Sequence, residues 1–431
     1  MKPVITWIKA NLALVIFCVI IVVAPIASFL VSNRMNNRIR EELKSRVSES
    51  WSDLGRLGTA TYQLPAALPG TEPVVVKGPL NKASLEIYEA KARKIKQDAD
   101  QLYEEVIAEN HDDHKPIIDG LFPDPSPLDA TVKPFELVQT YPQAHEKLLE
   151  KVNAGKPVDP DVLMDALNEV RSNYITSLGQ GEENADLSEE DQKNLAQRLK
   201  KARLDMYYDQ ARRHSVYADL SVFHLQPWES PDTPSMTQCY DWQEAFWAKE
   251  DVIAAIAKAN SGDDGELLDI TSAPVKRIIQ LIVRDRREEK FFSGGGRGEE
   301  TAAPVMEPDP SQPLETDFKS SLTGRDTRNG LYDVRYVELI IHVASDGLGK
   351  LNSAINSTGL LTITDEQITS IDEWAALEEG YLYGRAHVVQ VTLTIECPFF
   401  REWTSKYMPR SVKAARGVPL PTEDQNQPEE G

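Results

Sequence analysis

The stretch Leu12–Val31, which reads LALVIFCVIIVVAPIASFLV, carries no charged residue over its whole length. About 20 helical residues span the hydrocarbon core of a bilayer, at roughly 1.5 Å per residue. A helix satisfies its own backbone polar groups in lipid, and a single proline such as Pro25 is tolerated there. We therefore expect an uncleaved transmembrane helix over residues 12–31.

Two other interpretations of this stretch stay open. A secretory signal peptide has an apolar run of about 7–15 residues and a small-x-small cleavage site. This run is longer, and the nearest candidate site would place Pro25 at −3 and Ala27 at −1, which fits poorly. A buried helix of a soluble domain is the third interpretation. Because the sequence has no second run of this kind, a membrane anchor predicts a single-pass protein with its body on one side.

The charges around the stretch leave its orientation open. Lys2 and Lys9 precede it, and five basic residues follow it closely, namely Arg34, Arg38, Arg40, Lys44 and Arg46. The positive-inside rule alone favours a cytoplasmic body, but short N-terminal tails usually stay inside and long domains translocate largely regardless of charge.

The composition is that of ordinary globular material, with 41% hydrophobic and 27% charged residues among 431, a length that suggests two or three domains. The formal net charge of −21 argues against nucleic acid or an anionic lipid surface as the main partner, because both need basic patches. Cys18 lies in the apolar stretch, and no CxxC occurs, so a structural zinc site is not expected. We expect Cys239 and Cys397 to be buried free thiols, with a disulfide between them as the alternative.

Two amphipathic helices are predicted between the apolar stretch and residue 110. Over 32–60, apolar residues recur at steps of three or four and form a stripe that needs a partner: Ile39, Leu43, Val47, Trp51 and Leu54. From Lys82 to Glu109 the steps alternate three and four, the 3.5-residue period of a coiled coil, through Leu85, Tyr88, Ala92, Ile95, Ala99, Leu102 and Val106. An intermolecular coiled coil and a helix packed on its own domain both fit the second pattern.

The C-terminal part of the chain predicts a small α+β module. Three strands are expected at Tyr332–Ser345, Leu360–Ile368 and His387–Cys397, with a helix at Leu348–Ser357 after the first of them. An acidic loop is expected at Glu373–Glu379. In the last strand Val389, Val391, Leu393 and Ile395 alternate with polar residues, so we expect a half-exposed antiparallel sheet covered by helix on one face.

These features resemble the inner-membrane alignment proteins of type IV pili and type II secretion, most of all the PilO-like and GspM-like proteins. The resemblance rests on a short start, one anchor, an amphipathic coiled-coil region, and the strand–helix–strand–strand order that ends the chain, including LGKLNSAINSTGLLTITDEQI. It implies a ferredoxin-like terminal module, a periplasmic body, and partners of the PilN or GspL kind. This chain is about twice the usual length, and a duplicated ferredoxin-like unit would explain part of the excess.

The expected organisation is α+β: a single N-terminal transmembrane helix, a helical or coiled-coil region, then one or two ferredoxin-like modules. The expected segments are a cytoplasmic N-terminus at 1–11, the transmembrane helix at 12–31, amphipathic or coiled-coil helices at 32–110, a helical insertion at 111–215, a first α+β module at 217–283, a flexible linker at 284–330, the terminal module at 331–410 and a disordered acidic tail at 411–431. Within the insertion, helices are predicted over about 136–153, 160–178 and 188–213. Within the first module, we predict a weak strand at Tyr217–Leu225, a helix at Gln238–Asn260 and a strand at Val275–Val283.

Catalytic and ligand-binding signatures are weak. His111, Asp112, Asp113 and His114 form the most metal-like cluster, but it reads better as a solvated loop. The glycine-rich run 294–298 has no strand leading into it, so it reads as linker rather than phosphate loop. Two pairs of residues read better as structural than as ligand-binding: Trp242 with Trp247, and His342 with His387. No GxSxG, HExxH or GxxxxGK[ST] motif occurs in the sequence.

The sequence therefore predicts a non-enzymatic scaffold in a bacterial inner membrane, single-pass and mostly periplasmic, with no catalytic residue, cofactor or metal. Its expected partners are the inner membrane and either PilN-like or GspL-like proteins or a second copy, with no nucleic acid and no small-molecule substrate. The alternative is a single-pass periplasmic sensor, which needs a pocket between the 217–283 and terminal modules. A membrane-tethered hydrolase using His111 and His114 is a third hypothesis.

Overall fold

The computed structural model describes residues 7–9, 11–59, 61–64, 74–77, 82–179, 187–284, 319–320 and 322–419. The chain divides into two compact units, one ending at Asp100 and the other beginning at Gln101. Of the expected linker at 284–330, the described residues are Arg284, 319–320 and 322–330. The glycine-rich run 294–298 and residues 420–431 of the expected tail lie outside the described residues.

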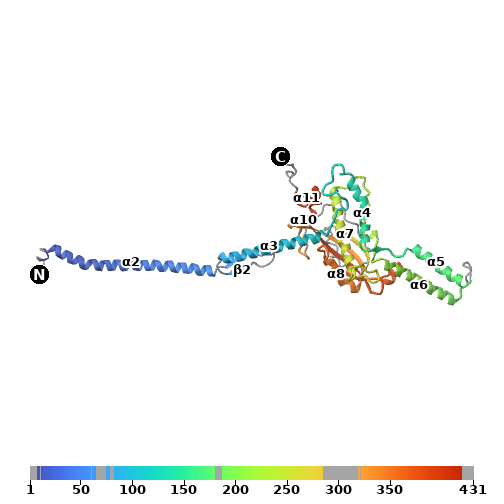
Figure 1. The fold of residues 1–431 in the computed structure, drawn as a ribbon, viewed down its shortest axis with the longest axis horizontal. Coiled ribbons are helices and arrows are strands. Elements are labelled where there is room, and N and C mark those ends of the chain that lie inside the picture. Colours follow the sequence, from blue (N-terminus) through green and yellow to red (C-terminus); the bar gives the residue numbers. More distant parts are fainter. Residues whose placement is uncertain are drawn as a thin grey trace, which may run out of the picture. The chain divides into compact units, whose positions relative to one another are not determined.

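The first unit is dominated by α2 (Leu12–Gly58), a single helix of 47 residues (Figure 1). It joins the predicted transmembrane and amphipathic segments, and at 1.5 Å per residue it is about 70 Å long. Pro25 lies inside α2 without ending it. The helix is long and apolar enough to cross a membrane, and none of its most apolar 18-residue window is buried within the chain. The short strands β1 (Thr61–Leu64) and β2 (Val74–Lys77) then pair antiparallel.

The helix α3 (Lys82–His111) follows, and its residues from Gln101 onward belong to the second unit. Here the predicted helices form close to their expected positions: α4 (Val132–Lys151), α5 (Pro160–Ser177), α6 (Glu189–Arg213) and α7 (Met236–Asn260). Local capping explains several starts, because Asp159, Ser188 and Ser235 each accept a backbone N–H of the helix that follows. At α7, Ser235 and Gln238 form a reciprocal capping box.

A mixed six-stranded sheet lies at the centre of the second unit, in the order β3-β4-β5-β6-β8-β7 (Figure 1). The strands are β3 (Ala154–Gly155), β4 (Val216–Tyr217), β5 (Val275–Arg284), β6 (Tyr332–Ala344), β7 (Thr362–Ser370) and β8 (Val388–Phe400). The first three are parallel neighbours, and every other pairing is antiparallel. Four short helices complete the unit: α8 (Leu348–Asn356), α9 (Glu373–Glu378), α10 (Arg401–Thr404) and α11 (Arg410–Ala415).

The expected first module and the expected terminal module share this one sheet. β5, assigned to the first, pairs antiparallel with β6, assigned to the second, from Val275↔Val343 to Arg284↔Tyr336. Sequence periodicity identifies each strand but not its partner, because pairing across more than forty intervening residues leaves no local trace.

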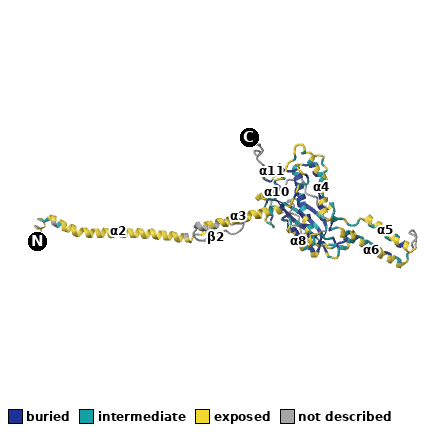
Figure 2. Ribbon diagram, in the orientation of Figure 1, coloured by how far each residue is buried: buried dark blue, intermediate teal, exposed yellow. Residues whose placement is uncertain are grey.

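Two cores stabilise the second unit. The main core lies between the sheet and the helices α4, α7 and α8, with α7 packed on β5 and β6, and Figure 2 shows the buried residues gathered there. Cys239 and Cys397 are free thiols in this core, and Trp247 is fully buried. A smaller second core joins the base of α6 to α9 and the loop after it through Tyr207, Ala211, Tyr217, Ile270, Ala376, Leu382, Tyr383 and Val388.

Several local predictions are corrected. The strand expected over Tyr217–Leu225 lasts only two residues, because Asp219 caps a 3-10 turn at Leu220–Phe223. The expected acidic loop at 373–379 contains α9, capped by Asp372. The polar face of β8 is not wholly exposed to solvent, since Glu396 is fully buried. Its carboxylate accepts hydrogen bonds from the hydroxyl groups of Ser320, Thr323 and Tyr336, and it forms an ion pair with Arg325.

Candidate functional site

Apolar side chains line α2 beyond its charge-free segment and remain exposed in the chain itself (Figure 2). Their exposed fractions run from 49% to 71%, for Met35, Ile39, Leu43, Val47, Trp51 and Leu54. Soluble proteins bury such a continuous stripe, because each large apolar side chain gains about 1.5–3 kcal/mol on full burial. The α2 stripe, defined by these six residues, therefore has the composition of a surface that another helix covers.

The spacing of the α2 stripe restricts how a partner helix can lie on it. The first five members follow one another at steps of four residues, and the last step, from Trp51 to Leu54, is three residues. This spacing exceeds the 3.6-residue turn, so the stripe winds slowly in a right-handed sense around α2. The stripe on α3 has the 3.5-residue period and winds left-handedly. The two stripes therefore suit different packing geometries.

The α3 stripe is also exposed where its side chains are described. Leu85, Ile95 and Leu102 are 54%, 66% and 61% exposed, whereas Ile107, one turn further on, packs against the main core. The outer part of α3 is thus without an apolar partner among the described residues, and its last turns belong to the folded second unit.

Asn110 holds the end of α3 in the second unit. Its side chain is fully buried and donates from Nδ2 to the carbonyl oxygens of Pro398 at 2.6 Å and Gly359 at 3.2 Å. Its Oδ1 accepts from the backbone N–H of Phe400 at 3.0 Å and from Nε1 of Trp403 at 2.9 Å. One amide thus satisfies four buried groups on two segments that are distant in sequence. Nothing in the sequence singles out Asn110, because a single asparagine at a helix end carries no pattern.

The metal-like cluster is only partly the solvated loop that was expected, because the His114 side chain is buried. His114 is 3% exposed, and its Nε2 lies 3.1 Å from Oδ1 of the buried Asp251 on α7. Burial lowers the pKa of His114, but the hydrogen bond and charge of Asp251 outweigh it and raise the pKa to about 9. His111 packs edge-on against Trp403, while Asp112 and Asp113 are exposed. Among the described residues, no group of three or more His, Cys, Asp or Glu side chains is arranged to hold a metal ion.

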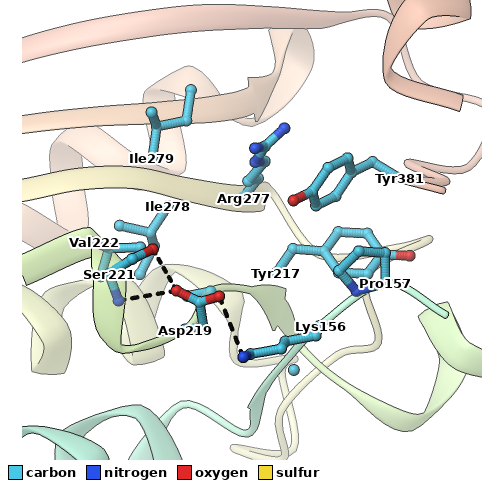
Figure 3. Close-up of a pocket in the computed structure, with 12 residues that line it drawn as sticks. Lys156, Pro157, Tyr217, Asp219, Ser221, Val222, Arg277, Ile278, Ile279 and Tyr381 are labelled. Carbon is cyan, nitrogen blue, oxygen red and sulfur yellow. Dashed lines mark hydrogen bonds and ion pairs between the residues drawn. The ribbon is translucent and has the colours of Figure 1, made fainter. Parts of the chain in front are cut away.

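A small recess lies where β4 leaves the sheet beside β5 (Figure 3). Its volume is about 70 Å³, and its lining comes from three places: residues after β3 and β4, the start of β5, and Tyr381. Figure 3 shows two separate groups of charges, Lys156 with Asp219 on one side and Arg277 with Tyr381 on the other.

Both groups of charges in the recess are satisfied internally. Lys156 lies 3.5 Å from Asp219, whose pKa is lowered, against the effect of burial, by hydrogen bonds from Ser221 and by Lys156. Arg277 lies over the ring of Tyr381 at 3.7 Å and 3.8 Å from Glu379. Ligand sites for drug-sized molecules have volumes of about 300–1,000 Å³. The recess has room for a water molecule or a very small group.

A group of buried charges holds the C-terminal segment on the fold. Arg416, just after α11, lies 2.9 Å from both Glu244 on α7 and Asp333 on β6. Arg335 also pairs with Glu244, at 2.6 Å. His342 on β6 contacts the hydroxyl of Tyr383, and the exposed His387, just before β8, contacts Glu373. These contacts position backbone segments.

Comparison with known proteins identifies no family. No protein-family model matches the chain, and no curated protein matches it. A solved structure described as a crystal structure from Akkermansia muciniphila aligns over 64% of this chain and 96% of that chain, at 10% identity and a TM-score of 0.20. Similarity at that level carries no argument about fold or function.

Proposed function

We propose that this protein is a non-enzymatic, membrane-anchored scaffold that assembles through the exposed stripes of α2 and α3. The observation that carries the proposal is the α2 stripe, six large apolar side chains that are each about half exposed or more. Covering half of such a side chain is worth roughly 1 kcal/mol, so pairing along the stripe is favourable once two copies share one bilayer.

The finer assignment is to the inner-membrane platform of a type IV pilus or type II secretion system, with the bulk of the chain periplasmic. Support comes from the order of elements: one apolar helix, a second helix with a coiled-coil period, then an α+β unit. The strand order β5-β6-β8-β7, with α7 and α8 on one face, is compatible with a ferredoxin-like unit whose last helix and strand precede its first strand. In this proposal there is one such unit, where the sequence left one or two open.

The stripe proposal is tested on the full-length protein in detergent by sedimentation equilibrium. The variant Leu43→Asp with Val47→Asp places two carboxylates on the stripe, where pairing would have to desolvate them. The matched control is Ser45→Asp with Ser52→Asp, which adds the same charge to the opposite face of α2. We expect the wild type and the control to be oligomeric and the stripe variant to be monomeric. A wild type that sediments as a monomer would refute the proposal.

The pilus or secretion assignment needs its own test, namely affinity purification of the full-length protein from its native membrane. Components of a pilus or secretion platform should co-purify. Their absence, with self-association intact, would leave the scaffold and remove this assignment.

A ligand-binding ectodomain is the second candidate, because the recess lies between the two segments that such a sensor requires, near Tyr217 and Tyr381. At about 70 Å³ the recess limits any ligand to a very small group. A thermal-shift measurement on protein saturated with small carboxylates separates the sensor from the scaffold. A rise in melting temperature that is lost in Arg277→Gln would favour the sensor.

A further inference from the structure

The strand β7 forms the long edge of the six-stranded sheet. Among the described residues it has a strand neighbour on one side only, namely β8, and the opposite edge strand, β3, has just two residues. The last six residues of β7, 365–370, are all exposed. No backbone group of another described segment pairs with their outer side. These six residues, called here the β7 edge, offer about 20 Å of unpaired strand at roughly 3.3 Å per residue.

Two large apolar side chains are exposed along and just beyond the β7 edge. Ile368 on the strand is 49% exposed, and Trp374 on α9 is 78% exposed. Only two residues connect β7 to α9, and Asp372 fixes the start of the helix by accepting the backbone N–H of Trp374 at 3.0 Å. Ala376 on the same helix is buried in the second core. Trp374 is therefore presented by an anchored helix, as the aromatic anchors of protein interfaces are.

The charge around the β7 edge is entirely acidic. Residues 351–384 contain six carboxylates and no Lys or Arg. Of the six, Glu373 and Glu379 contact basic side chains elsewhere on the fold. Asp365 and Glu366, on the strand itself, take part in no ion pair among the described residues. A segment that pairs with this edge would therefore gain most from positive charge.

A second copy of this chain is a poor occupant of the β7 edge. Pairing two such edges would bring four carboxylates, Asp365 and Glu366 from each copy, onto a stretch of about six residues. Neither 351–384 segment has a Lys or Arg to offset them. Like charge is one of the devices that keep the sheet edges of two copies apart. Charge alone would protect the edge completely if it were not for the exposed Ile368 and Trp374, which favour a contact.

We propose that the β7 edge binds an extended basic segment of a different protein, which adds to the sheet as a further strand. In such a contact the backbone hydrogen bonds supply affinity and alternate side chains supply specificity. The contact uses neither α2 nor α3, so it goes beyond the scaffold proposal and is tested separately from the stripes.

The alternation along β7 specifies the segment. Glu366 and Ile368 pair with main-core residues of β8, whereas Asp365 pairs with a polar one and so lies on the opposite face. The bound segment should therefore carry a basic residue opposite Glu366, an apolar residue opposite Ile368 on the same face, and a second basic residue opposite Asp365. In an antiparallel segment this order reads apolar-x-basic-basic. Trp374, beyond the far end of the strand, adds apolar surface at the apolar end of the segment.

Surface plasmon resonance on immobilised full-length protein in detergent tests the proposal. The probe is the peptide Thr-Thr-Ile-Thr-Lys-Arg-Thr, titrated to about 1 mM. We expect saturable binding that weakens in about 1 M salt, and none for the acidic peptide Thr-Thr-Ile-Thr-Glu-Asp-Thr. Absence of saturable binding by the basic peptide would show that the carboxylates only protect the edge, and the proposal would be wrong.

Variants separate the β7 edge from the general negative charge of the chain. Asp365→Lys with Glu366→Lys should abolish binding of the basic peptide and allow binding of the acidic one. The matched control, Glu189→Lys with Glu190→Lys, reverses two exposed neighbouring carboxylates at the outer end of α6 and should bind the basic peptide as the wild type does. Trp374→Ser should weaken binding about tenfold. Equal losses in the edge variant and the control would mean non-specific attraction and would overturn the proposal.

Backbone methylation distinguishes strand addition from a purely electrostatic contact. One basic peptide is N-methylated at its third and fifth residues and another at its fourth and sixth. Because alternate N–H groups of an added strand point toward β7, only one of the two peptides should lose binding. The same result for both peptides would contradict strand addition.

Discussion

Replacing Asn110 by leucine should destabilise the second unit severely, because one buried amide satisfies four groups there. Leucine has the same branched shape, although it is larger, and it has neither donor nor acceptor. The carbonyls of Gly359 and Pro398, the N–H of Phe400 and Nε1 of Trp403 would therefore lose their partner. Each buried unsatisfied group costs about 1–3 kcal/mol. Relaxation and water entry recover part of this sum, so we expect a loss of about 3–5 kcal/mol, the upper end for a single substitution.

Urea unfolding of the full-length protein in detergent measures this loss through tryptophan fluorescence, since Trp403 and Trp247 are both buried in the second unit. The matched control is Glu109→Leu, at the exposed neighbouring position of α3, where we expect a change of less than about 0.5 kcal/mol. A loss below about 1 kcal/mol for Asn110→Leu would refute the reasoning that this amide holds the end of α3.

Three further predictions concern other parts of the chain. His114 has a folded pKa of about 9 against 6.5 unperturbed, so its pairing with Asp251 stabilises the fold fully below pH 6.5 and less as the pH rises through 9. His114→Gln should flatten the free energy of unfolding across that range, and an unchanged pH profile would contradict the pairing. Arg416→Ala removes one buried ion-pair partner from both Glu244 and Asp333. We therefore expect the free energy of unfolding to fall by about 3–5 kcal/mol and a protease to cleave after α10 sooner than in the wild type. Protease resistance equal to that of the wild type would contradict this expectation. Leu102→Asp should weaken association without lowering the stability of the second unit, because the side chain is 61% exposed, whereas Gln97→Asp on the opposite face should do neither. Unchanged sedimentation of Leu102→Asp would remove α3 from the assembly surface.

Long periodic elements were predictable from the sequence. The helix over 82–109 and the strand over 332–345 form almost where their periodicity places them, since each period reflects a local geometry. The continuation of the apolar stretch into the amphipathic helix is also confirmed, because no glycine or second proline interrupts it before Gly55. The expected coiled-coil pairing stays a prediction.

Contacts between distant residues were not predictable. The pairing of β5 with β6, the four contacts of Asn110 and the pairing of His114 with Asp251 all join segments separated by tens or hundreds of residues. The cluster at 111–114 illustrates the problem, since its polar composition indicates solvent while tertiary packing buries one of its histidines beside Trp403 and Trp247.

The central claim is that the α2 stripe faces another copy, and disulfide cross-linking through one introduced cysteine tests it most directly, because the native Cys239 and Cys397 are buried in the second unit. In a Cys18→Ser background, full-length protein in native membranes would carry one new cysteine at Leu43, at Val47 or, as the opposite-face control, at Ser45. We predict disulfide-linked dimers for the Leu43 and Val47 positions and none for Ser45. Equal cross-linking at all three positions, or none at any, would contradict a stripe that faces a second copy.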